Sequence, residues 1–389
     1  MISYCTNIYP AESWQETFAS LEAGIPSIRH YLEEWKSPAL NVPLGIGLRL
    51  SAKAATDLLT FPGEIERLNL WLSEWDAVVQ TINGFPYGNF HEGRIKELVF
   101  KPDWTTYERF EYTEKLLNIL ARISPQEYIP LTVSTLPGSH KYFHADEERM
   151  FAYLDSLCGL MNRIHQETGK ILTVGLEPEP MGHFDDTYGT IRFFHRLQGV
   201  SRRPELIQKH LGVTYDTCHF AVMGESPDFS LSAWNEYDIP VVKIQFSNAL
   251  ELNVSSPGDL SILLPYTEQT YFHQTSILLP DDNTPMLFAD LPEALEWANR
   301  HPEVLHGSRF RIHYHIPLGA TPEAPLENTH ELNLAVVEYL RSHPHFRPVL
   351  EVETYTWNVL PPTLKQDISR QIASEIDTMQ RLIDKYPFL

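Results

Sequence analysis

The feature that most constrains the fold is an alternation of short apolar segments with longer segments of helical period. Nine short segments are rich in apolar or β-branched residues, and most of them are nearly continuous in apolarity, a pattern typical of parallel strands that are covered by helices. They are residues 2–8, 44–50, 77–84, 129–135, 171–177, 211–217, 241–247, 309–316 and 348–354.

The segments between these strands carry apolar residues at helical spacing, most clearly at 146–168 and 362–386. Repeated strand–helix alternation predicts an α/β fold, most simply a TIM (β/α)8 barrel. A doubly wound sheet is the alternative, but the sequence holds no GxGxxG motif and no P-loop.

Nine strands are one too many for such a barrel. We therefore assign 309–316 to a long excursion before the last strand, within an insertion at approximately 250–346 whose first part, 250–308, is loop-rich. No linker divides the chain, so residues 1–389 are expected to form a single TIM barrel domain.

Composition excludes several classes of protein. Of the 389 residues, 43% are hydrophobic, enough for a large core, and 51 acids against 30 bases give a net charge of −21, which disfavours general nucleic-acid binding. Three cysteines without a CxxC motif indicate a reducing compartment. Without a signal peptide or a long apolar stretch, we expect a cytoplasmic protein with no membrane insertion. Homo-oligomerisation stays open.

Two acids end the fifth strand. Glu177 and Glu179, in "GLEPEP", lie two residues apart and therefore share one face of a strand. Burying two carboxylates on one face is costly unless a cation meets them.

Polar side chains also end the later strands. In a TIM barrel the chemistry lies at these carboxyl ends, so distant residues are expected to meet there. Carboxylate and imidazole ligands suit a divalent cation such as Zn, Mn or Mg. Taken singly, each residue has another interpretation, such as a surface ion pair, a turn cap or a solvent-facing imidazole. The candidates are Asp216, His219, Lys243, Gln245, His313, His315, Glu351 and Glu353.

A second cluster follows the third strand, at 83–104. Aromatic rings and amides of this kind can wall a polyol pocket, and a well-packed loop is the alternative. The candidate substrate-binding residues are Asn83, Phe85, Tyr87, His91 and, from the fifth strand, Glu179.

The motifs "GLEPEP", "YDTCH", "KIQFS", "HYHIPLG" and "LEVETYTW" resemble, in this order, the xylose-isomerase-like TIM barrel superfamily of sugar isomerases, epimerases and apurinic-site endonucleases. With "YCTNIYPAESW", "NGFPYGNFH" and "PDW", the chain more closely resembles the metabolite-traffic protein EboE family over nearly its whole length. That resemblance implies a gene cluster that includes a membrane prenyltransferase-like protein and makes or moves a small secondary metabolite.

The superfamily resemblance implies metal ligands at Glu177, Asp216, His219 and Glu353. The seventh-strand histidine of the superfamily falls near Gln245, which is a departure, and His313 or His315 is expected to supply the missing imidazole. Early-strand histidines of the three-zinc endonucleases have no match, since Asn83 stands on the third strand.

Three functions follow as hypotheses. The first is a divalent-metal-dependent isomerase or epimerase of a small sugar- or cyclitol-like, polyhydroxylated metabolite, with Glu177 and Glu353 exchanging protons and Lys243 stabilising an oxyanion. The second is a metal-assisted phosphoester hydrolase of the endonuclease type. The third is a non-catalytic metabolite-binding component.

Overall fold

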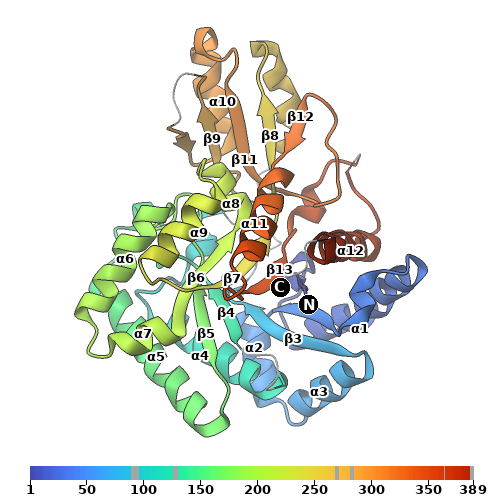
Figure 1. Ribbon diagram of the computed structural model, residues 1–389, viewed down its shortest axis with the longest axis vertical. Coiled ribbons are helices and arrows are strands. Elements are labelled where there is room, and N and C mark those ends of the chain that lie inside the picture. Colours follow the sequence, from blue (N-terminus) through green and yellow to red (C-terminus); the bar gives the residue numbers. More distant parts are fainter. Residues whose placement is uncertain (89–95, 126–129, 268–270, 281–283, 363, 386–389) are drawn as a thin grey trace.

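Eight parallel strands close into a barrel in the order β1–β13–β7–β6–β5–β4–β3–β2 (Figure 1). The computed structural model describes residues 1–88, 96–125, 130–267, 271–280, 284–362 and 364–385. The closed parallel order confirms the predicted TIM barrel. The barrel strands are β1 (Ser3–Cys5), β2 (Leu44–Arg49), β3 (Ala77–Asn83), β4 (Leu131–Thr135), β5 (Leu172–Leu176), β6 (Leu211–Asp216), β7 (Val241–Phe246) and β13 (Val349–Val352).

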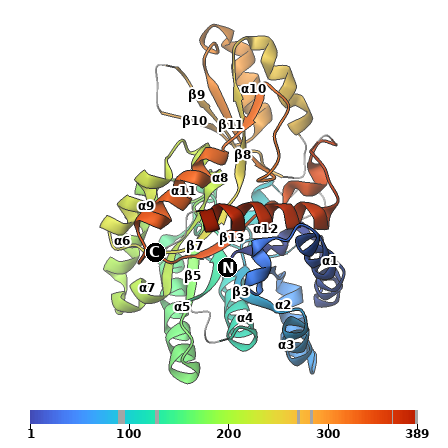
Figure 2. The same cartoon turned by 45° about the vertical axis from the view of Figure 1, so that its right-hand side comes forward.

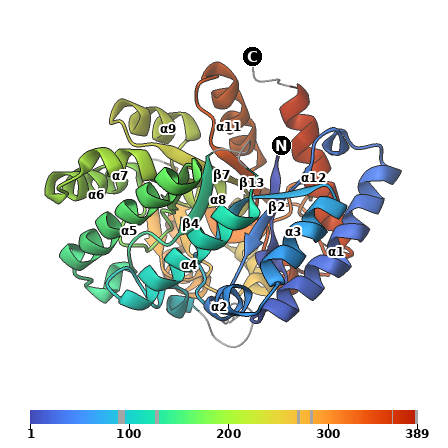
Figure 3. The ribbon, with the colours of Figure 1, turned by 90° about the horizontal axis from the view of Figure 1, so that it is seen from below.

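Helices surround the barrel, as the view from below shows (Figure 3). They are α1 (Trp14–Glu34), α2 (Ala52–Thr60), α3 (Glu64–Glu74), α4 (Tyr107–Ile123), α5 (Glu147–Thr168), α6 (Thr187–Val200), α7 (Pro204–His210), α8 (Thr217–Val222), α9 (Pro227–Glu236), α11 (His330–Ser342) and α12 (Ile368–Lys385). Short 3-10 turns link several elements: η1 (Thr6–Ile8), η2 (Pro38–Asn41), η3 (Lys96–Phe100), η4 (Lys141–Phe143) and η7 (Thr356–Val359).

The sequence specifies both ends of α5, the clearest predicted helix. The Asp146 side chain accepts hydrogen bonds from the backbone N–H groups of Glu148 and Arg149, which caps the first turn. Gly169 ends the helix with a φ of 74°, a left-handed conformation that favours glycine. Between these ends the predicted apolar stripe is buried against the barrel.

The excursion between β7 and β13 forms a second, antiparallel sheet above the carboxyl ends of the barrel strands (Figure 1). Its strand order is β10–β9–β11–β8–β12. The segment that was expected to be loop-rich therefore holds short strands. A single residue, Ser247, separates the end of β7 from the start of β8. The elements are β8 (Asn248–Asn253), η5 (Pro257–Tyr266), β9 (Thr275–Leu278), β10 (Met286–Phe288), α10 (Leu291–Arg300), η6 (Pro302–Val304), β11 (Arg309–Ile316) and β12 (Leu326–Asn328).

Separate hydrophobic clusters support the two sheets. One fills the space between the barrel and its helices, and the other lies between the second sheet, α10 and η5. The inserted sheet thus has its own apolar cluster. A single domain over 1–389 stays a prediction. Helix α12 lies beside α1 and beneath the second sheet (Figure 2). In the described part of the chain, no helix combines the length and apolarity needed to cross a membrane.

Candidate metal centre and pocket

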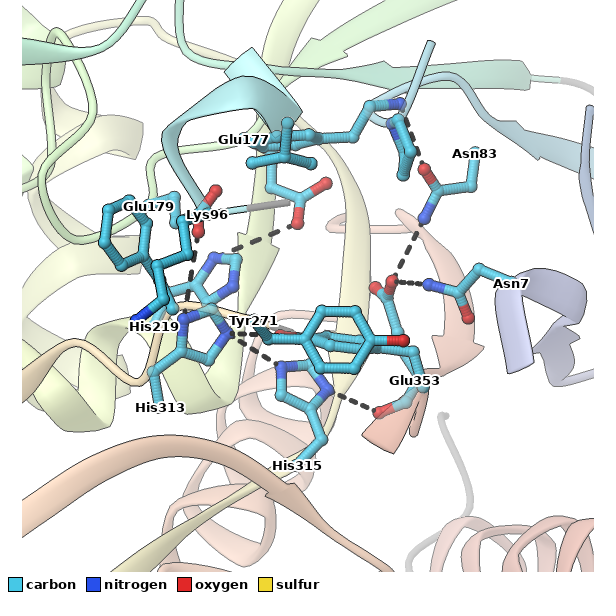
Figure 4. Close-up of a pocket in the computed structure, with 15 residues that line it drawn as sticks. Asn7, Asn83, Lys96, Glu177, Glu179, His219, Tyr271, His313, His315 and Glu353 are labelled. Carbon is cyan, nitrogen blue, oxygen red and sulfur yellow. Dashed lines mark hydrogen bonds and ion pairs between the residues drawn. The ribbon is translucent and has the colours of Figure 1, made fainter. Parts of the chain in front are cut away.

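Glu177 and Glu179 lie at the mouth of the barrel, just beyond the end of β5. Both side chains are buried, at 4% and 7% exposure, and both line the same pocket (Figure 4). Burial raises the pKa of Glu177 well above its usual range, and the nearby carboxylates of Glu353 and Asp216 raise it further. Burial also raises the pKa of Glu179, to about 7. Negative charge on both carboxylates is therefore unfavourable unless a cation neutralises it.

Three carboxylates from three strands meet in this region. Ligand oxygens of Glu177, Asp216 and Glu353 all lie within 4.8 Å of one another. The carboxyl ends of β5, β6 and β13 bring them together, as the barrel topology requires.

Two carboxylate oxygens of this group have no hydrogen-bond partner among the residues that the structure describes. Asp216 Oδ1 accepts hydrogen bonds from the N–H of Cys218 at 2.7 Å and from Ser247 Oγ at 2.7 Å. By contrast, Asp216 Oδ2 and Glu177 Oε2 are buried and have no hydrogen-bond partner among the described residues. Buried acceptors are almost always satisfied, so these two orphaned oxygens fit a bound cation.

Amide side chains hold Glu353 in place. Its Oε1 accepts hydrogen bonds from Asn7 Nδ2 at 2.5 Å and Asn83 Nδ2 at 3.1 Å, and its Oε2 accepts one from Gln245 Nε2. Gln245 therefore orients a carboxylate through its N–H, while its buried Oε1 keeps no partner among the described residues. Direct ligation by Gln245 stays a prediction.

Three imidazoles close the other side of the centre. The Nδ1 atoms of His219 and His315 face the carbonyl oxygens of Pro178, at 3.1 Å, and of Glu353, at 2.9 Å. A carbonyl only accepts, so these Nδ1 atoms carry a proton, and in the neutral ring Nε2 presents a lone pair. This tautomer is the one in which metal-binding histidines are usually held.

The histidines of β11 are fully inside the protein. Burial lowers the pKa of His315 to about 4 and that of His313 well below its usual range, and the neighbouring imidazoles lower the pKa of His313 further. Both rings are therefore neutral at pH 7, which is the protonation state that metal binding needs.

The pocket above the centre has about 530 Å³ of empty space, including its open mouth. Aromatic rings form much of its wall, and the Lys96 ammonium at its edge is paired with Asp290. The aromatic lining residues are Phe85, Tyr271, Phe272 and Tyr355.

The structure brings most of the predicted site residues to one place. Asn83, Phe85, Glu177, Glu179, His219, His313, His315 and Glu353 all line the pocket. Asp216 lies beside them, since it belongs to the carboxylate group with Glu177 and Glu353. Gln245 is hydrogen-bonded to Glu353.

Two predicted residues lie elsewhere. Lys243, on β7 two residues before Gln245, is deeper in the barrel, where its ammonium pairs with Glu351 at 2.7 Å and donates to Ser134 Oγ. The Tyr87 ring packs against Tyr112, at a 5.1 Å centroid distance, and lines a separate surface hollow beside α2 and α4. Neither residue lines the pocket, so the structure does not support a contact between either of them and the substrate. His91 lies outside the described residues.

Sequence analysis missed several residues of the site. Asn7 follows the first strand. Its position at a strand end, which identified Glu177 and Asp216 as candidates, could have identified Asn7 as well. Tyr271, Phe272 and Gln274 lie in the insertion, where no barrel rule places them. Tyr355 follows Glu353 by two residues.

No protein-family model and no curated protein sequence matches the chain. The resemblance to the EboE family therefore stays a prediction.

Several solved structures have a chain course similar to that of this protein. An IolI protein with bound zinc shares 10% identity at a TM-score of 0.49, and 100% of this chain is aligned with 99% of that one. The 3-keto-D-glucoside 4-epimerase YcjR from E. coli shares 12% identity at a TM-score of 0.46, with 98% of each chain aligned. A xylose isomerase-like TIM barrel/4-hydroxyphenylpyruvate dioxygenase fusion protein shares 14% identity at a TM-score of 0.45, over 98% of this chain and 44% of that one. Likeness at this level tells nothing about the reaction of this chain.

Proposed function

We propose that the protein is a divalent-metal-dependent isomerase or epimerase of a small, polyhydroxylated carbonyl compound. The observation that carries the proposal is the meeting of Glu177, Asp216 and Glu353 beneath a pocket lined by aromatic and polar side chains, with two buried oxygens that have no hydrogen-bond partner among the described residues. The donor set fits a divalent ion, because the acids need a positive charge and the imidazoles present lone pairs. A divalent ion bound by these residues would polarise a carbonyl group of the substrate.

The two glutamates differ in how firmly they are held. Both oxygens of Glu353 accept hydrogen bonds from amide side chains, so this carboxylate is fixed in one orientation. Glu177 Oε2 has no hydrogen-bond partner among the described residues, and Oε1 lies 3.8 Å from His219 Nδ1. Glu177 is therefore the freer carboxylate, and we assign it the proton exchange with substrate carbon.

The walls of the pocket suit a sugar- or cyclitol-like molecule. Aromatic rings such as Phe85 and Tyr271 offer apolar faces to C–H surfaces, while Glu179 and Asn83 offer groups that hydrogen-bond to hydroxyls. The resemblance to the EboE family extends this proposal to a metabolite that is made or moved in secondary metabolism.

A phosphoester substrate is less well suited. Among the described residues that line the pocket, Lys96 is the one lysine or arginine, and its charge is already paired with Asp290. Phosphate binding ordinarily uses free cationic or backbone donors.

Proton exchange tests the proposal directly. The metal-loaded protein is incubated in D2O with a panel of aldoses, ketoses and oxidised inositols, and deuterium at carbon is measured by mass spectrometry. We expect incorporation into at least one compound, and a loss of at least about 100-fold in Glu177→Gln, the size of contribution expected of an acid–base group.

Glu338→Gln is the matched control, because Glu338 is exposed on α11 and does not line the pocket. It should exchange at the wild-type rate. If metal and panel compounds bind but no carbon-bound deuterium appears, the protein is a binding component and the isomerase proposal is wrong.

A further inference from the structure

The interior of the barrel beneath the carboxylate group holds a buried ion pair. Side chains alternate along a strand, so Lys243 and Glu351 share the inward face with Gln245 and Glu353, each two residues further along the same strand. Branched apolar side chains normally fill the interior of a TIM barrel. The side chains of Lys243 and Glu351 are both 0% exposed, and burying two charges in this way is costly unless they compensate for other charges.

Contacts from neighbouring strands hold this pair in one arrangement. The Lys243 ammonium lies 2.7 Å from Glu351 Oε1 and donates a hydrogen bond to Ser134 Oγ at 3.1 Å. The Glu351 carboxylate occupies the space where a Cβ atom on Gly47 would lie, so β2 limits its movement on that side. The ammonium is therefore a fixed positive charge beneath the mouth of the barrel.

Glu351 extends the carboxylate group toward the centre of the barrel. One of its oxygens lies within 4.8 Å of an oxygen of Glu353, and oxygens of Glu353, Glu177 and Asp216 lie within the same distance of one another. When ionised, the four acids carry four negative charges, of which Lys243 offsets one. A divalent ion among Glu177, Asp216 and Glu353 would offset two more. The ion and the ammonium would thus be neutralised by the same acids while repelling each other.

We propose that Lys243 is a positioning residue that serves as an internal counter-ion: it stabilises the carboxylate group before a divalent ion binds, and its charge weakens the binding of that ion. This role rests on the metal position of the proposed function and requires no contact between Lys243 and substrate or ion. It has the opposite sign to that of an ordinary supporting residue, whose loss weakens metal binding about 10- to 100-fold. Positions two apart on a strand are separated by roughly 7 Å, close enough for a buried charge to change the affinity of a divalent ion at least about 10-fold.

Calorimetric titration of the metal-free, full-length protein with Mn²⁺ tests the sign of this effect. Glu351→Gln leaves the ammonium without its acid, so the affinity for Mn²⁺ should fall at least about 10-fold. Adding Lys243→Met to Glu351→Gln removes both charges, and the affinity should return to within a few fold of the wild-type value. The three proteins, with Lys243→Met alone, form a double-mutant cycle that isolates the contribution of the pair.

Lys243→Met alone removes only positive charge, so it should bind Mn²⁺ at least as tightly as the wild type does. Lys53→Met is the matched control, because Lys53 is an exposed residue of α2 that pairs with Asp57 at 2.9 Å and does not line the pocket. It should leave the affinity unchanged. Circular dichroism establishes that each variant is folded. The double variant leaves no buried charge unpaired, so its affinity decides the matter even where a single variant does not fold.

A loss of about 10-fold or more in the folded double variant, relative to the wild type, would overturn the counter-ion role, because Lys243 would then be an ordinary supporting residue. Weaker binding by folded Lys243→Met would overturn it as well. If the wild type binds Mn²⁺ and exchanges deuterium at carbon while the double variant shows no recovery, the counter-ion role alone is wrong. If the wild type binds no divalent ion, the proposed function is wrong together with it.

Discussion

At the scale of single residues, the site is built by side chains that hold other side chains. Asn7, Asn83 and Gln245 fix Glu353, and Gln274 fixes both Glu179 and His313. Such supporting residues set the tautomer and direction of a ligand, and their loss usually weakens metal binding.

Substitution of Gln274 tests whether a supporting residue affects metal binding. Gln274→Leu removes the acceptor that keeps the proton on His313 Nδ1, and we expect the affinity for Zn²⁺ to fall about 10- to 100-fold. Competition with a chromophoric chelator measures the affinity. Gln80→Leu is the control, since Gln80 donates to the Pro130 carbonyl away from the pocket and should leave the affinity unchanged. Equal affinity in Gln274→Leu and the wild type would contradict a supporting role.

At the scale of elements, close approach between strands fixes the interior of the barrel. Gly47 on β2 leaves room for the Glu351 carboxylate of β13, and a Cβ atom there would overlap it. Glu351 in turn pairs with Lys243 of β7 at 2.7 Å, with both side chains fully buried. The floor of the site is therefore a buried ion pair for which a glycine makes space, and not a second row of substrate contacts.

Gly47→Ala should lower the free energy of unfolding by about 1–3 kcal/mol, the range for overpacking in a tight interior. Urea unfolding followed by circular dichroism measures the change. Gly199, near the end of α6, has open space where a Cβ atom would lie, with no heavy atom within 4 Å, so Gly199→Ala should instead stabilise by up to about 1 kcal/mol through helix propensity. A stable Gly47→Ala protein would mean that Glu351 moves at little cost.

At the scale of the whole molecule, Glu375 joins segments that are far apart in the sequence. This buried residue of α12 accepts hydrogen bonds from Tyr4 Oη at 2.8 Å, the Leu318 N–H at 2.9 Å and Thr354 Oγ1 at 2.8 Å. It thereby ties the last helix to the first strand, to the segment that follows β11 and to the segment that follows the last strand. Burial raises the pKa of Glu375 above its usual value of 4.5 despite these donors.

The raised pKa of Glu375 decides how stability changes with pH. A carboxyl group whose pKa is higher in the folded chain takes up a proton on folding. Its contribution to stability is complete below the unfolded pKa and is lost as the pH rises through the folded pKa. Glu375→Gln removes this titration, so the wild type should lose more stability than the variant as the pH rises above about 4.5.

Urea unfolding of both proteins at a series of pH values measures the difference in unfolding free energy. Glu338→Gln serves as a control, because Glu338 is exposed on α11 and lies outside this network. Parallel curves for the wild type and Glu375→Gln would mean that Glu375 is not protonated on folding.

The sequence by itself determined the barrel and the convergence of its strand-end acids. Apolar runs and helical stripes are local, and the closed parallel order then carries Glu177, Asp216 and Glu353 to one rim whatever the packing details. Only the tertiary structure decided which atoms meet there. The short strands β8, β9, β10 and β12, the partners Asn7 and Gln274, and the inward position of Lys243 depend on contacts between segments far apart in the chain. No local period in the sequence encodes such contacts, since they arise from how the inserted sheet packs over the barrel.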